Sequence, residues 1–556
     1  MGSSQTEEYL RNPTPPLEED QLIVNAVDIA AKVKPQAIYA EFPVSSTSYD
    51  EGFRTVNYER LANAVNGLAW WLTAQIGKSK LFDTLIYTGP NDFRQNAMIL
   101  ACVKTGYKLL LASPRNQVSA LKSLLEAVDC KYTLGANLNS PLVSAIQEAK
   151  PMPVFQIPSV EVLLEETFPH YAYNRTFEKA KHDPILILHT SGTTNVPKPI
   201  TYTNDWATVY TRALRLEAPT GTVSNDILFR QGRLFVMMPA FHGANIFPNF
   251  FCALTSQTTI VFPPANLPPT IESFLGGIQA TQVDVAFIPP HFIPQIASNP
   301  QYLDFVSQHV TTIISGGGAI PKPAGQVLSS RIKFFTKYAS TEMGSLPCTR
   351  PSGSWTPENW NCITPHPETG IEFQFHSHDN EGDMYEACIR RNHSNSDNEQ
   401  PIFKLFPKIH EFRTRDLFRR HPHSTNQWEW CGRVDDTIVL STGANISPVI
   451  MEEGLARHPD IRAVLMVGNG RLRPALMIEG KNEDTDLCEV SESLWDTIEE
   501  LNGEYCEDHR ITRSHVLFVD GGIPMARSAK GTIQRATTVE LYEKRLEELY
   551  VTADAV

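Results

Sequence analysis

The alternation of apolar runs with helical segments constrains the fold of this chain more than any other feature. Residues 55–76 place Leu61, Val65, Leu68 and Leu72 at spacings of four, three and four, which is typical of one helix face. Further helices are expected at 92–105 and 118–128, and apolar strands at 81–87, 107–112, 185–188, 234–239, 259–262, 283–288 and 310–315. Such alternation predicts parallel sheets covered by helices.

The pattern changes near residue 350. Residues 371–376 and 428–431 alternate like exposed strands, 392–400 is polar like a hairpin tip, and 538–549 is expected to be a helix. We predict an α/β protein with a large N-terminal domain of stacked mixed sheets flanked by helices. This domain includes a small β subdomain, and a small mobile α+β C-terminal domain follows. The expected bounds are a polar arm at 1–20, a core at 21–435 and a C-terminal domain at 436–556.

Composition excludes several classes of protein. The chain has 556 residues, which is too long for one compact core, and a formal net charge of −14 without a basic patch. Nucleic acid is therefore not an expected partner. Nine scattered cysteines form no CxxC, which fits a reducing compartment, and no apolar stretch is long enough to cross a membrane. We expect a cytoplasmic monomer that needs no membrane.

The segment 188–200, LHTSGTTNVPKPI, is suited to phosphate chemistry. It follows an apolar run and combines small hydroxyl side chains, a glycine and a lysine: Thr190, Ser191, Gly192, Thr193, Thr194 and Lys198. Hydroxyl donors on a glycine loop can approach a polyphosphate, and the lysine adds a mobile charge. The Walker ending G-K-S/T is absent. A simple turn after the strand is the alternative.

Five later segments strengthen the interpretation as a nucleotide site. They are SGGGAIP at 315–321, YASTEMG at 338–344, TRDLF around Asp416, GRVDD at 432–436 and PMARSAKGTIQR at 524–535. Together they supply bare backbone for a flat ring, an aromatic face, a hydroxyl, carboxylates and a late lysine. Each alone has a simpler explanation, such as a tight turn, a cap, an exposed ion pair or a surface lysine. We expect Asp416 to lie in a buried turn.

In this order, the six segments resemble the core motifs of the adenylate-forming superfamily. The resemblance extends from about residue 25 to about residue 550 and includes adenylation domains of nonribosomal peptide synthetases, aryl-acid activating enzymes and acyl-CoA synthetases. The segments GYKLLLASPRN at 106–116 and VLSTGANISP at 439–448 are most similar to fungal synthetase-like proteins, including carboxylic acid reductases. In those, an adenylation domain precedes a carrier domain and then a reductase or thioesterase.

The resemblance implies two steps, formation of an acyl-adenylate from ATP and a carboxylic acid, and then transfer to a thiol. It assigns the β- and γ-phosphates to residues 190–194 and Lys198, and Mg²⁺ to Glu342. Thr341 would donate to the α-phosphate, and Lys530 would bridge the substrate carboxylate and that phosphate. The remaining nucleotide-binding residues implied are Gly316, Gly317, Gly318 and Tyr338 around adenine, Ser340, and Asp416 with Arg433 at the ribose. Asp435 corresponds to the hinge.

Two positions depart from the family pattern. Ala339 replaces the glycine that usually precedes STE, and Val439 stands where many coenzyme A ligases carry a lysine. The second departure weakens the coenzyme A alternative.

The segment 239–245, PAFHGAN, indicates the class of acid. Amino-acid-activating members of the superfamily carry an aspartate here that pairs with the substrate ammonium, and this segment has no acidic residue. Burying that ammonium unpaired would cost several kcal/mol, roughly. We therefore expect an acid without an α-amino group, first an aryl acid of the benzoate type and second an aromatic α-keto acid. The predicted pocket residues are Phe241, His242, Gly243, Asn245, Gly317 and Ala339.

Two side-chain types in this region leave alternatives open. Phe241, Phe247, Phe250 and Phe251 suggest a flat apolar pocket, but the same spacing occurs in any core helix. His242 is expected to contact the substrate carboxylate or form the pocket wall as a catalytic residue, with a core histidine as the alternative.

The expected cofactors are ATP and Mg²⁺, and the expected acceptor is the phosphopantetheine of a carrier domain in cis or in trans. The residues after Lys530 are too few for a carrier domain, so we expect this partner outside the chain, with NADPH needed only by a separate reductase domain. A free-standing aryl- or acyl-CoA ligase is a second hypothesis. A non-catalytic nucleotide-binding protein is a third, against which Lys530, Glu342 and the 190–194 loop argue.

Overall fold

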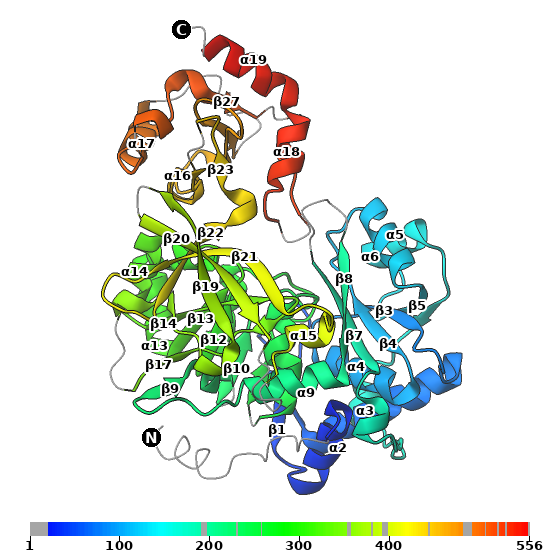
Figure 1. The fold of residues 1–556 in the computed structure, drawn as a ribbon. Coiled ribbons are helices and arrows are strands. Elements are labelled where there is room, and N and C mark those ends of the chain that lie inside the picture. Colours follow the sequence, from blue (N-terminus) through cyan, green and yellow to red (C-terminus); the bar gives the residue numbers. More distant parts are fainter. Residues whose placement is uncertain are drawn as a thin grey trace. The chain divides into compact units, whose positions relative to one another are not determined.

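A computed structural model describes most of the chain in two compact units (Figure 1). The described residues are 21–190, 197–229, 232–256, 258–352, 357–379, 382–391, 399–442, 445–481, 492–505, 507–519, 522–528 and 531–553. The first unit comprises residues up to 190, then 197–370 and 391–410, and the second comprises 371–390 and the chain from 411 onward. Among the described residues, no helix is long and apolar enough to span a bilayer, and the cysteines are free thiols.

The first unit contains two mainly parallel sheets. The seven-stranded sheet has the order β14-β13-β12-β10-β11-β1-β2 and the six-stranded sheet has the order β6-β5-β3-β4-β7-β8. Only the edge pairs β1–β2 and β7–β8 are antiparallel within these two sheets. The bounds of the first sheet are β14 Lys333–Lys337, β13 Thr312–Gly316, β12 Val285–Ile288, β10 Arg233–Val236, β11 Thr259–Val261, β1 Ile38–Pro43 and β2 Phe53–Asn57. Those of the second are β6 Val154–Gln156, β5 Cys130–Gly135, β3 Thr84–Thr88, β4 Lys108–Leu111, β7 Pro184–Thr190 and β8 Lys198–Thr203.

Each sheet is buried on both faces, which explains the nearly continuous apolar runs. Leu109 and Leu234 belong to the large core that contains residues from both sheets, whereas their neighbours Leu110 and Phe235 belong to two outer clusters. In Figure 1, α5 and α6 cover the outer face of the β3–β5 region. The helices of this unit are α2 Ile23–Val33, α3 Tyr58–Ile76, α4 Phe93–Thr105, α5 Val118–Ala127, α6 Pro141–Ala149, α7 Val160–Glu165, α8 Phe177–Ala180, α9 Asn204–Ala213, α10 Gly243–Ile246, α11 Ile271–Ala280, α12 Phe292–Ser298, α13 Pro300–His309, α14 Lys322–Ser329 and α15 Ile402–Leu405.

Smaller elements complete the first unit. A π-helix at Phe247–Cys252 continues directly from α10. A short hairpin follows β14, formed by β15 (Ala339–Ser340) and β16 (Gly344–Ser345), and β17 (Thr349–Pro351) pairs with β9 (Thr222–Ser224). A π-turn inside a helical segment is unusual and often occurs at functional sites.

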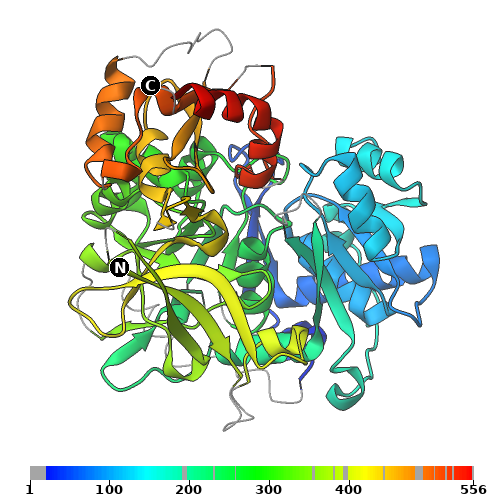
Figure 2. The ribbon, with the colours of Figure 1, turned by 45° about the horizontal axis from the view of Figure 1, so that its top comes forward.

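The second unit combines an antiparallel sheet with a small α+β region. Strands β19 (Ile371–Asp379), β20 (Gly382–Arg390), β21 (Glu411–Arg420) and β22 (Trp428–Arg433) pair in sequence and form the twisted green-to-yellow sheet of Figure 2. Helices α16 and α17 pack on one face of β25–β26, and α19 packs on the other. The remaining bounds are β23 Ile438–Val439, β24 Asn445–Ile446, α16 Val449–Leu455, β25 Ile461–Val467, β26 Ala475–Gly480, α17 Glu492–Asn502, β27 Val516–Phe518, α18 Arg535–Leu541 and α19 Glu543–Ala553.

The α/β fold class predicted from the sequence is confirmed, but three local predictions need correction. The predicted helix 55–76 begins only at Tyr58, because 53–57 form β2 and the Asn57 side chain caps the helix by accepting from the Arg60 N–H. The predicted helix 538–549 is two helices, because the backbone leaves helical geometry at the buried Tyr542 (φ −107°, ψ 10°). Asp416 lies in β21 and not in a turn.

Candidate active site

In the first unit, segments that follow several parallel strands lie close together. The His189 ring at the end of β7 stacks on Phe241 in the segment after β10, with 6.4 Å between centroids and an interplanar angle of 1°. His189 Nε2 also accepts from the Ser113 N–H, just beyond β4, at 3.1 Å. The Gln95 amide of α4 donates to the Ala240 carbonyl at 3.0 Å. These contacts join the two sheets at the carboxyl ends of their parallel strands, which is where ligands bind in open α/β folds.

The two strand residues that flank the predicted phosphate loop lie at this edge of the sheets. Thr190 and Lys198 are opposite each other in the β7–β8 pairing, and Lys198 is exposed. The predicted loop residues between them, Ser191, Gly192, Thr193 and Thr194, lie outside the described residues. The sequence analysis missed His189. A polar histidine at the end of an apolar run, directly before the loop, is the sequence feature that could have identified it. The His189 side chain is buried, with 7% of its surface exposed.

The predicted acid-pocket residues have different roles. Phe241 and His242 are partly exposed, and His242 Nδ1 caps α10 by accepting from the Ala244 N–H at 3.1 Å. Asn245 is buried and donates to the Met238 carbonyl at 2.9 Å, so it shapes the segment from inside. A Cβ on Gly243 would lie 2.9 Å from the Phe247 ring, which explains why a glycine fits there.

Three of the four phenylalanines proposed to line a flat pocket are core residues. Phe247, Phe250 and Phe251 are at most 3% exposed and lie in the π-helix. The Phe247 and Phe251 rings pack with Tyr202 and Trp206, and the Phe250 ring packs edge-on against Phe251. Only Phe241 of the four is partly exposed. The sequence could not separate these roles, because a helix packed on a core and a helix lining a pocket share the same apolar spacing.

Glycines at the end of β13 leave the backbone uncovered by side chains. A Cβ on Gly316 would approach the Lys337 carbonyl oxygen at 2.4 Å, so only glycine fits this position. Gly317 has φ +86° and its Cβ direction faces open space, with no atom within 4 Å. Gly316 pairs with Lys337, so Gly317 and the half-buried Tyr338 are the next residues on neighbouring strands. This glycine cradle fits a flat aromatic base.

The hairpin after β14 carries the other predicted nucleotide residues. Tyr338, Ser340, Thr341 and Glu342 are partly exposed and Ala339 is exposed. The Ser340 hydroxyl accepts from the Met343 N–H at 3.2 Å, so it supports the turn itself. The Tyr202 hydroxyl, which the sequence analysis also missed, donates to the Thr341 carbonyl at 2.6 Å.

The base of this hairpin is held by a buried ion pair. Lys337 Nζ donates to the Asp226 carboxylate and to the Leu346 carbonyl, the latter at 3.1 Å. Burial lowers the pKa of Lys337, but the charge and hydrogen bond of Asp226 together with the neighbouring Cys348 and Cys252 outweigh burial, and the pKa is raised. Lys337 is therefore charged at neutral pH.

Glu342 is the carboxylate predicted to bind Mg²⁺, and it lies among the described residues. No cluster of three or more His, Cys, Asp or Glu side chains capable of holding a metal occurs among them. Mg²⁺ in nucleotide sites commonly uses one or two carboxylates together with phosphate oxygens and water. The Glu342 carboxylate is suited to that role.

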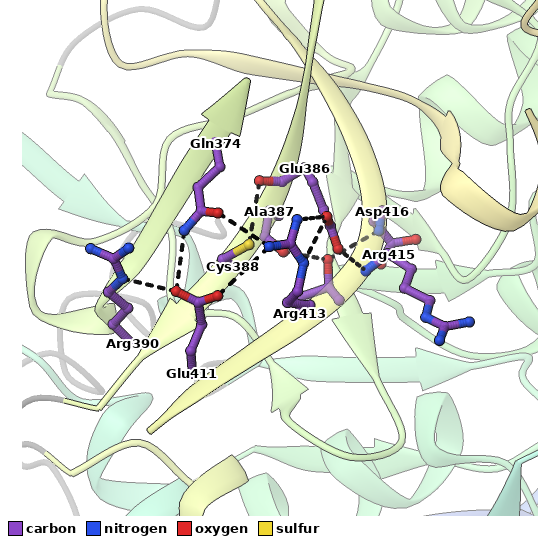
Figure 3. A network of polar contacts seen from close by, with 10 residues as sticks. Gln374, Glu386, Ala387, Cys388, Arg390, Glu411, Arg413, Arg415 and Asp416 are labelled. Carbon is purple, nitrogen blue, oxygen red and sulfur yellow. Dashed lines mark hydrogen bonds and ion pairs between the residues drawn. The ribbon is translucent and has the colours of Figure 1, made fainter. Parts of the chain in front are cut away.

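In the second unit, a bulge in β21 presents Asp416 (Figure 3). Residues 414–416 oppose Ala387 alone, and Arg415 has φ +62°. The buried Glu386 carboxylate accepts from the Arg415 N–H at 3.3 Å and from Arg413 Nε at 3.0 Å. The Thr414 hydroxyl accepts from the Asp416 N–H and donates to the Ala387 carbonyl. The sequence around Glu386 and Arg413 does not reveal their role, because the contact between their side chains depends on the pairing of β20 with β21.

The next strand brings a cation to Asp416. Arg433 is its cross-strand partner in β22, and Arg433 Nε lies 3.5 Å from the Asp416 carboxylate. Asp435, the predicted hinge residue, accepts from Arg415 Nη1 at 2.9 Å. Asp416, Arg433 and Asp435 thus lie close together. The sequence analysis predicts Arg433 near Asp416 but no link to Asp435, and the ribose and hinge roles stay predictions.

The late lysine, Lys530, lies outside the described residues, but its flanks form a hairpin. Gly531 N–H donates to the Ser528 carbonyl at 2.8 Å, and Gln534 N–H donates to the Ala526 carbonyl at 2.8 Å. The buried Glu479 of β26 anchors one arm, accepting from Arg527 Nη2 on both carboxylate oxygens at 3.0 Å and from Met525 N–H at 3.0 Å.

Comparisons with known proteins agree with this architecture. The chain is 30% identical over 548 residues to an isocyanide synthase–NRPS hybrid of Aspergillus fumigatus, covering 95% of this chain and 33% of that protein. It is 26% identical over 546 residues to a carboxylic acid reductase of Neurospora crassa, covering 96% and 51%. The chain thus spans a third to a half of these relatives.

Solved structures show the same fold. The o-succinylbenzoate coenzyme A synthetase of Bacillus subtilis, solved with AMP, aligns with a TM-score of 0.68 at 17% identity, covering 93% of this chain and 98% of that one. Residues 29–372 match the model of the AMP-binding enzyme family, and residues 435–554 match that of the AMP-binding enzyme C-terminal domain. The chain belongs to the AMP-binding, adenylate-forming enzyme family.

Proposed function

We propose that this chain activates an organic acid without an α-amino group, most specifically an aryl acid of the benzoate type, as its acyl-adenylate. It then passes the acyl group to the phosphopantetheine thiol of a carrier domain. The main support is the convergence of the Thr190–Lys198 edge, the 239–245 segment and the Thr341–Glu342 hairpin at one edge of the first unit.

The first step joins two anions. An oxygen of the substrate carboxylate attacks the α-phosphorus of ATP, a new P–O bond forms, and the bond to the β-phosphate oxygen breaks to release pyrophosphate. The chain must offset the repulsion of the two anions and stabilise the charge that develops at phosphorus. Lys198 would bind the terminal phosphates, Thr341 would donate to the α-phosphate, and Lys530 would bridge the two reactants. Mg²⁺ held beside Glu342 would neutralise phosphate charge.

The remaining residues would orient the nucleotide. The backbone of 316–318 and the Tyr338 ring would enclose adenine, and Asp416 would accept from the ribose hydroxyls beside Arg433. A carboxylate has about four lone-pair sites, so an ion pair with Arg433 is compatible with this role.

The substrate class follows from charge and shape. The segment 239–245 offers Phe241 and His242 but no carboxylate to balance an ammonium. The partly exposed Phe241, stacked on His189, gives a flat wall suited to an aromatic ring. The core positions of Phe247, Phe250 and Phe251 limit this wall to one phenylalanine of the four.

In the second step the thiol sulfur attacks the acyl carbonyl carbon, and AMP leaves with the electrons of the broken C–O bond. A rotation about Asp435 would withdraw Lys530 between the two steps. The curated relatives named above support a carrier domain as acceptor, because they are an NRPS hybrid and a carboxylic acid reductase longer than this chain.

The first assay measures ATP–pyrophosphate exchange in the presence of benzoates, aromatic α-keto acids, fatty acids or amino acids. The second uses mass spectrometry to detect the acyl group on a carrier domain or on coenzyme A. We expect exchange with aryl acids and loading of the carrier. Exchange with free amino acids alone would overturn the pocket argument. Formation of acyl-coenzyme A without carrier loading would assign the chain to the coenzyme A ligases.

A further inference from the structure

A buried phenol contacts the centre of the predicted catalytic hairpin. Tyr202 lies in β8 and is fully buried, and its hydroxyl donates to the Thr341 carbonyl at 2.6 Å. That carbonyl belongs to the peptide that joins Thr341 to Glu342. The hydrogen bond thus fixes the link between the proposed α-phosphate donor and the proposed Mg²⁺ ligand.

The ring of Tyr202 is itself held in place. It packs edge-on against Trp206 with centroids 4.5 Å apart, and against Phe247 and Phe251 at 6.2 Å each. A close-packed ring on a strand cannot swing away, so the hydroxyl position is set by the core. Burial, and then the nearby Glu342 charge, raises the pKa of Tyr202 well above its ordinary value. The phenol therefore remains a donor throughout the pH range of an enzyme assay.

The other contacts of the hairpin act at different points. Lys337 bonds to the Leu346 carbonyl, and the Leu346 N–H donates to the Tyr338 carbonyl at 3.0 Å, which closes the base. Ser340 accepts from Met343 N–H within the turn. Tyr202 contacts the Thr341 backbone from the core side, on a different element and in the same compact unit.

We propose that Tyr202 is a positioning residue for the Mg²⁺·ATP site, acting through the peptide between Thr341 and Glu342. This inference rests on the proposed function, because that function assigns the two side chains to the α-phosphate and the metal. A displacement of about 1 Å in a positioned group is enough to reduce a rate by about 10²-fold. Removal of the phenol oxygen would release the peptide and leave the ring packing unchanged.

The experiment compares Tyr202→Phe with Tyr58→Phe in the full chain. Tyr58 is a matched control, because it is also buried and its hydroxyl also donates to a backbone carbonyl, that of Ala253 at 3.2 Å. ATP binding is measured by calorimetry with Mg²⁺ and with EDTA, and exchange of the 338–346 amides with deuterium is followed by mass spectrometry. Neither measurement requires knowledge of the acid.

We expect Tyr202→Phe to weaken ATP binding about tenfold in Mg²⁺, to weaken it less in EDTA, where only the contact of Thr341 with the α-phosphate is affected, and to speed amide exchange in the hairpin. Tyr58→Phe is expected to match the unaltered protein in all three. Equal weakening with and without Mg²⁺, or no weakening, would overturn the proposal. If Tyr202→Phe fails to fold while Tyr58→Phe folds, the proposal is also overturned, since the Tyr202 hydroxyl would then stabilise the core.

The pyrophosphate assay of the unaltered protein separates this inference from the proposed function. Binding of Mg²⁺·ATP without pyrophosphate release for any acid would refute acid activation and leave the role of Tyr202 to be decided by the binding results. Where activity is present, Tyr202→Phe is expected to lower the turnover number about 10- to 100-fold and to raise the Mg²⁺ concentration needed for half-maximal rate.

Discussion

At the scale of single residues, side chains that support the site are as informative as those assigned to the nucleotide. Glu386 and Arg413 stabilise the bulge that presents Asp416, and His189 aligns Phe241 with the edge of β7. Arg415 occupies the left-handed region, which costs a non-glycine residue about 1 kcal/mol. The motifs identified the chemistry, whereas these supports depend on strand register and could not be inferred from spacing along the chain.

The buried pair Lys337–Asp226 gives a prediction about stability. Lys337→Met removes one partner and leaves a buried carboxylate uncompensated, which is expected to lower the free energy of unfolding by about 3–5 kcal/mol. The double variant Lys337→Met/Asp226→Leu should recover most of that loss, because neither charge remains. Urea denaturation of the three proteins measures both values. A double variant as unstable as the single one would show that the pair has another role.

The pH dependence of this pair follows from the same contact. The folded-state pKa of Lys337 is raised, so the unfolded chain releases the lysine proton at lower pH than the folded one. The stabilisation that Lys337 contributes is therefore fully present below the ordinary lysine pKa, neutral pH included, and is lost as pH rises through the raised value.

At the scale of elements, the alternating pattern predicted seven of the thirteen strands described in the two mainly parallel sheets within a few residues, and it gave no prediction for β1, β2, β5 and β6. It missed β8, whose sequence KPITYT contains a proline and few apolar residues, as is tolerated at a sheet edge. It missed β14 because only Phe334 and Phe335 are apolar in that strand. The prediction of a single C-terminal helix was wrong at Tyr542, because the burial of this residue between α18 and α19 depends on tertiary packing and not on local sequence.

The hairpin at 526–534 gives a prediction at this scale. Arg527→Met removes the guanidinium that joins Glu479 to residues 525–528 and should loosen the arm that precedes Lys530. We expect acyl-adenylate formation to fall about 10-fold or more, while thioester formation from supplied acyl-adenylate stays within about twofold, because the lysine serves only the first step. Single-turnover assays of both half-reactions measure this ratio. An equal loss in both would indicate a general disturbance of the domain.

At the scale of the whole molecule, the proposed chemistry uses residues from both compact units. Tyr338, Thr341 and Glu342 belong to the first unit, and Asp416, Arg433 and Asp435 belong to the second. The family was recognisable from the sequence because its motifs combine glycines, hydroxyls and charges in a fixed order. The acid substrate could not be identified from the sequence, because the shape of the pocket depends on which side chains of α10 and the π-helix face the core.

The most direct test of the account measures pyrophosphate release by the unaltered chain and by Lys530→Ala, with Lys544→Ala, an exposed lysine of α19, as the control. The account predicts release that depends on an acid lacking an α-amino group, a loss of at least ~10²-fold in Lys530→Ala, and no change in Lys544→Ala. If the unaltered chain releases no pyrophosphate with any organic acid, or if Lys530→Ala is as fast as the control, the proposed function is wrong.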